Sequence, residues 1–255
     1  MKEFKKDTLV VKVMPNRDEM GKIAAADIHD AILKLLQEKD HINMIFAAAP
    51  SQNDVLQHLT SYQDIDWSRI HAYHMDEYIG LPKELADRCF GTYLNDHIFG
   101  QVPFGSVNLI DATAVDYAAE CARYAQLLRE NPTDIVVMGI GENGHIAFND
   151  PWVADFDDPE LVKTVPLDEV CRMQQVNDGC FASLDLVPTH AMTLTCPALF
   201  AGSHLFCIVP AKTKAAAVKR TIEGEINHDC PATILRRHSS AKLYLDGDSS
   251  KELTL

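Results

Sequence analysis

The sequence of 255 residues lacks paired cysteines, a long hydrophobic run and an excess of basic residues. No apolar segment approaches the ~20 residues that span a bilayer, and the first residues, Met1 to Asp7, lack the apolar core of a secretory signal. The seven cysteines are odd in number and none has Cys-x-x-Cys spacing, which argues against a disulfide framework or a zinc site. We therefore expect a cytoplasmic protein with reduced thiols.

The charge balance is strongly acidic. Lysine and arginine number 23 against 37 aspartates and glutamates, a formal net charge of -14. Nucleic acids and anionic membranes select basic surfaces, so we expect neither as a partner. A phosphorylated small molecule is still allowed, because a few local cations can bind one phosphate. With 47% hydrophobic residues and no repeat, low-complexity tract or linker, residues 1–255 are interpreted as a single domain.

Hydrophobic periodicity predicts alternating strands and helices. Asn16 and Glu19 have the spacing of a capping box at the start of the first helix. Residues 152–190 give no clear pattern and are expected to be loop-rich. The alternation predicts an α/β fold with a mostly parallel sheet and helices on both faces. Strands are expected at 8–14, 42–48, 70–74, 135–138, 191–195, 205–209 and 242–245, and helices at 17–38, 51–62, 90–99, 114–130 and 212–223.

The most informative stretch is the glycine-rich segment Gly139–Pro151, which follows the apolar run 135–138. Glycine lets the backbone turn sharply and approach a ligand closely. In an open α/β sheet, ligands bind at the carboxyl ends of the strands. His145 at such a position can move protons near neutral pH. The alternative is a structural histidine in an ordinary turn.

Other polar residues also follow predicted strands. Asp76 could serve as a base, Ser51 could cap a helix or bind a phosphate oxygen, and Lys214 could bind an anion. Each has a simpler explanation, as a solvated acid, a plain helix cap or a solvated lysine. Along one strand, His71 and His74 would point to opposite faces, which disfavours a shared metal. The convergence of the strand ends at one sheet edge is the stronger argument for a site.

Two segments, Met75–Pro82 and Gly139–Pro151, resemble the two signatures of glucosamine-6-phosphate deaminases (isomerases), a family related to 6-phosphogluconolactonases. The resemblance extends over nearly the whole chain. It implies a Rossmann-like, doubly wound fold and conversion of glucosamine 6-phosphate to fructose 6-phosphate and ammonia, without a metal or organic cofactor. It also implies that Asp76 is the base that takes the C2 proton and returns it to C1. His145 would open the pyranose ring.

The resemblance assigns further residues and shows departures. Asp150 stands where the family has a glutamate that partners the histidine, and Asn143 stands where it usually has an aspartate. Lys214 matches a phosphate-binding lysine, and Arg172 is the nearest candidate for a phosphate-binding arginine. The turn Ser51-Gln52-Asn53 occupies the position of a phosphate loop that is usually richer in glycine, so we expect side chains to replace part of the backbone cradle.

Two other functions compete with amino-sugar phosphate deamination. A 6-phosphogluconolactonase would share the glycine turn, but lactonases tend to carry Asp-Glu-Arg where this chain has Asp76-Glu77-Tyr78. A non-catalytic sugar-phosphate sensor would tolerate the amide at Asn143. The expected partner is in every case a small sugar phosphate. A homo-oligomer is possible, and the sequence does not distinguish glucosamine from galactosamine 6-phosphate.

Overall fold

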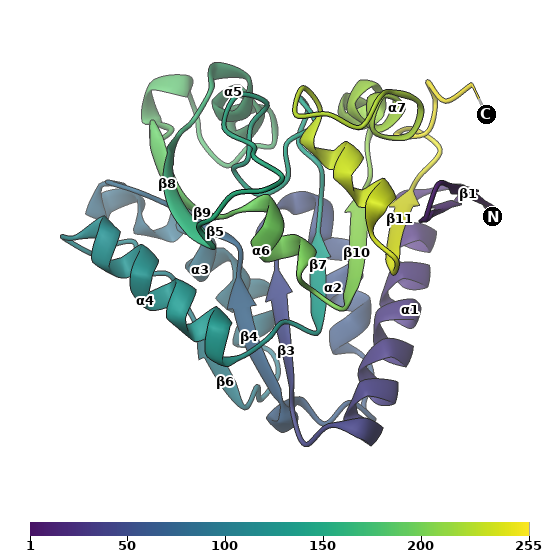
Figure 1. The fold of residues 1–255 in the computed structure, drawn as a ribbon, viewed down its shortest axis with the longest axis horizontal. Coiled ribbons are helices and arrows are strands. Elements are labelled where there is room, and N and C mark those ends of the chain that lie inside the picture. The colour runs from purple at the N-terminus through teal and green to yellow at the C-terminus, as the bar shows by residue number, and fades with distance from the viewer. Residues whose placement is uncertain (255) are drawn as a thin grey trace.

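The computed structural model describes residues 1–254, which form a mostly parallel sheet with helices packed on it (Figure 1). Within that range β1 alone runs antiparallel in this sheet, through its pairing with β2. The sheet has the strand order β1 (Lys2–Lys6), β2 (Leu9–Val13), β11 (Ala241–Leu245), β10 (His204–Val209), β7 (Ile135–Met138), β3 (Ile42–Phe46), β4 (Ile70–His74) and β6 (Ser106–Asn108).

Both faces of the sheet are buried, as expected for a parallel sheet. Successive side chains of β3 alternate between two apolar cores: Met44 and Phe46 face one, and Ile45 faces the other. The first core contains side chains of α1 (Arg17–Glu38), α2 (Asn53–Thr60) and the segment of α3 (Phe90–Leu94). The second contains side chains of α4 (Tyr117–Glu130), α6 (Cys196–Phe200) and α7 (Ala215–Glu223). The predicted α/β class with helices on both faces is confirmed.

Helix α1 illustrates why the sequence signals succeed. The Asn16 side chain accepts a hydrogen bond from the Glu19 backbone N–H at 2.9 Å, which satisfies one of the free donors at the helix start. Its buried stripe includes Met20, Ala24 and Ile28, at the spacing of one helical face. The predicted bounds of this helix, 17–38, are those observed.

A second, antiparallel sheet is absent from the sequence-based prediction. It has the order β5 (Asp76–Tyr78), β9 (His190–Leu194) and β8 (Val162–Pro166), and α5 (Glu169–Asn177) follows β8. The expectation of a loop-rich 152–190 therefore missed β8 and α5, although the rest of this range is mostly turns and loops. Helix α5 buries Cys171, Gln174 and Gln175, so its inner face has little of the apolar periodicity by which helices are recognised. The short strands β1, β5 and β6 are likewise not predicted.

The strand predicted at 70–74 is observed as β4, so His74 and Asp76 lie on different strands. β4 ends at His74, and the chain enters the second sheet at β5 after Met75, whose carbonyl accepts the Leu194 N–H at 2.8 Å. His74 Nε2 accepts the Ile110 N–H at 2.8 Å, and burial lowers the pKa of His74 to about 3. This ring is therefore a neutral structural acceptor.

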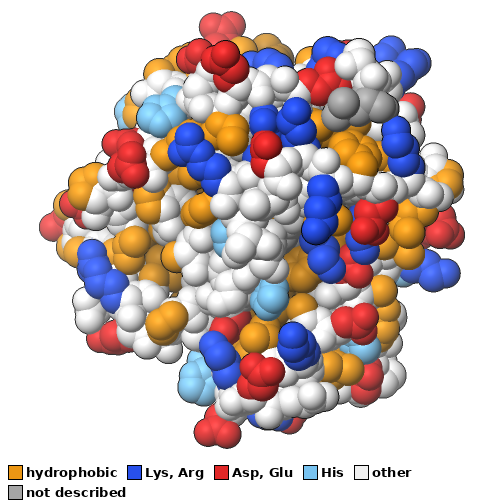
Figure 2. Space-filling view, turned by 45° about the vertical axis from the view of Figure 1, so that its right-hand side comes forward, with side chains coloured by type: hydrophobic (Ala, Val, Ile, Leu, Met, Phe, Trp, Pro, Cys, Tyr) orange, Lys and Arg blue, Asp and Glu red, His pale blue; other side chains and the backbone are white. Residues whose placement is uncertain are grey.

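The surface in Figure 2 carries acidic and basic side chains side by side, with hydrophobic side chains scattered among them. The excess of acidic groups is thus dispersed on this face and does not form a single block. Among residues 1–254, the helices include none that combines the length and the apolar character needed to cross a membrane.

Candidate active site

A small cavity, of about 60 Å³, lies at the carboxyl ends of β3, β4, β7 and β10. Ser51, Asp76, His145 and Lys214 line it, and each follows a different one of these strands. Gln52 lines it beside Ser51. The structure thus brings together, in one cavity, polar residues that are far apart in the chain, as the strand-end argument predicts.

Backbone geometry in the glycine turn places His145 in this cavity. The Gly141 N–H donates to the His145 carbonyl at 2.9 Å, so the segment folds back on itself. A Cβ atom on residue 141 would lie 2.1–2.3 Å from atoms of the His145 ring, so only glycine fits there. Gly144 has a φ of 92°, in the left-handed region that favours glycine. The turn therefore requires glycine at both positions in order to present the imidazole.

His145 faces a buried acid. Its Nδ1 lies 3.1 Å from Asp150 Oδ1, a contact of ion-pair length in which the ring N–H lacks the alignment of a hydrogen bond. Asn143 Nδ2 donates to the same carboxylate oxygen at 2.8 Å, and Asn143 Oδ1 accepts the His145 N–H at 2.9 Å. Burial acts to raise the pKa of Asp150, but these neighbours outweigh it and the pKa lies below the usual value. Asp150 is therefore an anion beside the imidazole near neutral pH.

Asp76 stands where the chain passes from the large sheet to the small one. Its side chain is buried, at 7% exposure, and it lines the cavity. Burial raises the pKa of Asp76 well above its usual range, and the charge of Glu77 raises it further. A carboxylate in such a setting is a stronger base than one in water.

The neighbouring Glu77 has a structural role. Its carboxylate accepts the backbone N–H groups of Tyr78, Phe90 and Gly91 at 2.9–3.0 Å, which fixes the start of α3 against β5. Burial raises the pKa of Glu77 in spite of these bonds. Both acids of the Asp-Glu pair are thus buried, but only Asp76 faces the cavity.

The cavity is also lined by a buried lysine. Lys214 is 5% exposed and ends the 3₁₀ turn Lys212–Lys214, just before α7. Burial lowers the pKa of Lys214, and the charges of Asp178 and Glu142 act against that shift. A phosphate in contact with this ammonium group would compensate its desolvation.

Ser51 and Gln52 line the cavity as well. Gln52 Nε2 donates to Ser51 Oγ at 3.0 Å and to the Ile208 carbonyl at 3.2 Å. The Gln52 side chain is fully buried, and its Oε1 has no partner among the described residues. These hydrogen bonds of Gln52 hold the turn, and its expected contact with a phosphate stays a prediction.

Two of the predicted binding residues do not line this cavity. Asn53 lines a neighbouring pocket, and its Oδ1 accepts the Tyr93 hydroxyl. The guanidinium of Arg172 donates to the carbonyls of Val187 and Leu184, at 2.9 and 2.7 Å. The Nη2 group of Arg172 thus holds the segment after α5, and a phosphate-binding role for this residue stays a prediction.

Some residues at the site are not found by sequence reasoning. Gln174 and Gln175 line the cavity from α5, and Gln174 Oε1 accepts the Glu142 N–H at 2.9 Å. Phe90 and Phe148 supply apolar wall. Asp168, the N-cap of α5, approaches Asn143. A capping signal at Asp168, followed by Glu169, is the available sign of this helix.

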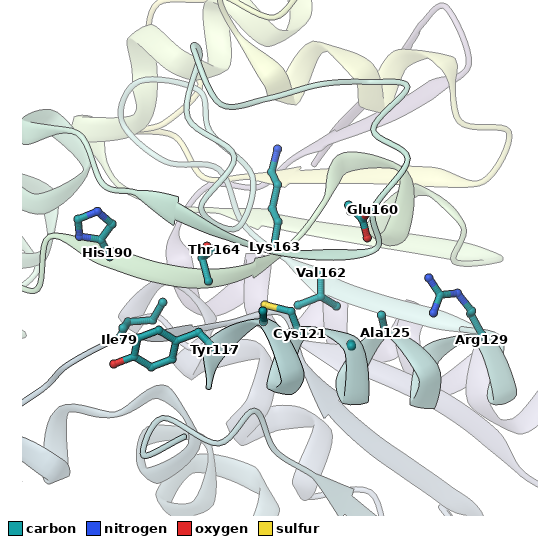
Figure 3. A pocket seen from close by; sticks show the side chains of 12 residues that line it. Ile79, Tyr117, Cys121, Ala125, Arg129, Glu160, Val162, Lys163, Thr164 and His190 are labelled. Atoms are coloured by element: carbon teal, nitrogen blue, oxygen red, sulfur yellow. The ribbon is translucent and has the colours of Figure 1, made fainter. Parts of the chain in front are cut away.

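A larger cavity, of about 590 Å³, lies between α4 and β8 (Figure 3). Figure 3 shows Cys121 and Ala125 of α4 facing Val162 of β8 across it, with Arg129 and His190 toward its ends. Size alone would favour this cavity as the site. It contains none of the predicted site residues, and the smaller cavity holds the acid, the imidazole and the buried cation. We therefore assign the chemistry to the smaller cavity.

One group near the site has atoms that metals bind. His145, Asp150 and Cys171 offer ligand atoms within 4.8 Å of one another. Burial raises the pKa of the Cys171 thiol, and the charges of Asp150 and Asp168 add to this. A metal there would have to displace the thiol proton, because the thiolate is the ligand form.

The matched family is described as glucosamine-6-phosphate isomerases/6-phosphogluconolactonase, over residues 15–157. The chain belongs to this family of enzymes. It is 33% identical over 234 residues to a glucosamine-6-phosphate deaminase of Lactobacillus delbrueckii subsp. bulgaricus, with 92% of this chain and 95% of the relative covered. It is 32% identical over 212 residues to one of Listeria monocytogenes, with 83% and 88% covered.

Solved structures of similar fold agree with the sequence comparisons. A monomeric glucosamine-6-phosphate deaminase superposes with a TM-score of 0.84 at 28% identity, over 94% of this chain and 98% of that one. A 6-phosphogluconolactonase from Thermotoga maritima superposes with a TM-score of 0.75 at 20% identity, over 93% and 99%. The second likeness concerns the fold alone.

Proposed function

We propose that this enzyme isomerises and deaminates an amino-sugar 6-phosphate, with glucosamine 6-phosphate as the first candidate. The products would be fructose 6-phosphate and ammonia. The observation that carries the proposal is the convergence of Asp76, His145 and Lys214 on one cavity from three strand ends. The names of the relatives support the same reaction. The proposed location is the cytoplasm, and oligomeric state stays open.

Ring opening is assigned to His145. The step requires removal of the anomeric hydroxyl proton and delivery of a proton to the ring oxygen. An imidazole can accept the first and donate the second near neutral pH. The Asp150 anion, 3.1 Å from Nδ1, stabilises the imidazolium that exists between the two transfers. Asn143 holds that carboxylate from the other side.

Isomerisation is assigned to Asp76. The carboxylate takes the proton from C2 of the open-chain aldehyde and returns it to C1, while a second proton passes from the C2 nitrogen to O1. The aldehyde thereby becomes an alcohol and the C2 amine becomes an imine. Water then adds to the imine carbon, and ammonia leaves as the ketone forms. One base can serve both carbons because they are adjacent. The raised pKa of Asp76 favours proton abstraction, and it also requires a pH at which the group is ionised.

Phosphate binding is assigned to Lys214 with Ser51 and Gln52. Lys214 supplies the charge, and the Ser51 hydroxyl can donate to a phosphate oxygen. Binding energy at this remote group fixes C1 and C2 against Asp76. The cavity of about 60 Å³ is far below the ~300–1,000 Å³ of typical ligand sites. Gln174 and Gln175 of α5 also line the cavity, next to the groups assigned to the substrate.

The test is ammonia release from purified protein with glucosamine 6-phosphate, galactosamine 6-phosphate and unphosphorylated glucosamine. We expect release from one phosphorylated sugar, none from glucosamine, and loss of release in Asp76→Asn. Absence of release from both phosphorylated sugars would contradict the proposal. The exposed Lys212→Met serves as a folding control, because it lies in the same turn as Lys214 without lining the cavity.

The lactonase alternative is disfavoured by the surroundings of Tyr78. This ring is fully buried and packs against Phe90, Phe148 and Phe181, with centroids 4.6–5.7 Å apart. An arginine at this position would place a charge in an aromatic cluster. Accelerated opening of 6-phosphogluconolactone that is abolished by His145→Ala would restore this alternative.

A further inference from the structure

The glycine turn and helix α5 meet at a bridge of three polar side chains, Asn143, Asp150 and Asp168. Asn143 Nδ2 lies 2.8 Å from Asp150 Oδ1 and 3.3 Å from Asp168 Oδ2, so its two N–H bonds are shared between two carboxylates. The Asp168 N–H points to Asp150 Oδ2, at 3.5 Å. All three residues are at least partly buried, with Asp150 fully so and Asp168 9% exposed. The amide thus separates two acids that would otherwise repel each other.

The orientation of the Asn143 amide is fixed at its other end. Asn143 Oδ1 accepts the His145 N–H at 2.9 Å, so the oxygen must face the turn and the nitrogen must face the acids. Asp168 is fixed in the same way. Its Oδ1 accepts the Cys171 N–H as the N-cap of α5, and its Oδ2 accepts from Asn143. Both oxygens of Asp168 are therefore in use as acceptors, which an asparagine cannot reproduce.

Resting on the proposed function, we propose that Asp168 is a positioning residue for the reaction. Through Asn143 it orients Asp150, and through Asp150 it fixes His145 for ring opening. It also links α5, which covers the cavity with Gln174 and Gln175, to the histidine that acts inside the cavity. Asp168 does not line the cavity and is not expected to touch substrate.

The test is a double-mutant cycle of Asn143→Asp and Asp168→Asn. In Asp168→Asn, one end of the new amide caps Cys171 and the other points N–H groups at the N–H groups of Asn143. In Asn143→Asp, three carboxylates meet without a donor among them. Each conflict leaves a buried polar group unsatisfied, so each single variant should lose about tenfold or more in kcat. The double variant restores a donor at position 168 and an acceptor at position 143, so its kcat should equal or exceed that of the weaker single variant.

Two further variants separate positioning from helix capping. Asp168→Ser retains a capping oxygen for Cys171 but is too short to reach Asn143, so it should keep its unfolding midpoint and lose kcat. Asp116→Asn alters another N-cap aspartate, which accepts the Ala119 N–H at 3.0 Å on α4, and should leave kcat unchanged. KM should change less than kcat in Asp168→Ser, because Asp168 does not line the cavity.

The outcomes are distinct. Wild-type kcat in Asp168→Asn, or losses that simply multiply in the double variant, would overturn the positioning role. If wild-type protein releases no ammonia, the proposed function fails. The coupling between residues 143 and 168 is then tested by the urea unfolding midpoints of the wild type, the two single variants and the double variant. Non-additive midpoints would still establish the coupling between residues 143 and 168, and additive ones would refute it.

Discussion

Two sets of side chains at the small cavity differ in chemistry. The proton-exchange set comprises Asp76, with a raised pKa, and the His145–Asp150 pair. The anion-binding set comprises Lys214, Ser51 and Gln52, which offer one cation and hydrogen-bonding groups. Under the proposed function, the first set moves protons and the second holds the phosphate. Substitutions in the proton-exchange set should therefore lower kcat, and those in the anion-binding set should raise KM.

Asp76→Asn provides the largest expected effect. The amide keeps the shape but cannot accept the C2 proton, and general base catalysis contributes about 10²–10⁴-fold. We expect kcat for ammonia release to fall by about 10³-fold or more, with little change in binding of the phosphorylated sugar. Stopped assays give kcat, and calorimetry gives the affinity. Asp248→Asn, at an exposed position near the C-terminus, is the matched control. Near-normal turnover in Asp76→Asn would show that Asp76 is not the base and does not belong to the proton-exchange set.

His145→Gln should have the second largest effect. Loss of the imidazole removes the proton shuttle, but open-chain sugar also forms slowly in solution, so part of the reaction survives. We expect kcat to fall about 10²-fold. The difference in kcat between His145→Gln and wild type should become smaller at low enzyme concentration, because spontaneous ring opening then keeps pace with turnover. The exposed His228→Gln should behave as wild type. A deficit that does not depend on enzyme concentration would assign His145 to a later step.

Lys214→Met tests the anion-binding set. The methionine fills the same space without the charge, and a charge-assisted hydrogen bond is worth ~1.5–3 kcal/mol. We expect KM to rise about 10–100-fold while kcat falls less than about threefold. Initial rates over a range of glucosamine 6-phosphate concentrations measure both. Lys212→Met is the neighbouring control. A loss confined to kcat would contradict the division between the proton-exchange set and the anion-binding set.

The smallest expected effect is on thermal stability, whose pH dependence should differ between wild type and Asp76→Asn. The pKa of Asp76 is raised in the folded state, so the folded protein favours the protonated acid. Stability from this group is present below the unfolded pKa of ~3.9 and is lost as pH rises through the folded pKa. The amide side chain has no charge to lose, so Asp76→Asn should melt higher than wild type at pH 8, by roughly 2–4 °C. Thermal melts from pH 4 to 8 should show the gap widening with pH, and a constant gap would contradict the assignment.

Strong local signals make the large sheet predictable. β7 is a continuous apolar run, β3 is apolar except at Asn43, and Asn16 caps α1 as the sequence indicates. The position of each residue after a predicted strand is enough to predict that Ser51, Asp76, His145 and Lys214 lie close together. Their roles stay predictions. The small sheet is not predictable in this way, because β5 has three residues and closely follows a strand of another sheet. Arg172 and Asp168 depend on α5, whose buried face is largely polar and gives no apolar period.

The strand order of the large sheet has a consequence for synthesis of the protein on the ribosome. The hairpin of β1 and β2 joins the rest of the sheet through β11, which follows the other strands of residues 1–254 along the chain. β10, which leads to Lys214, pairs with β7 on one side and with β11 on the other. A nascent chain therefore exposes the edges of β2 and β10 until residues 241–245 emerge. Such long-range pairing slows folding, so recovery of ammonia release should report the final closing of the sheet.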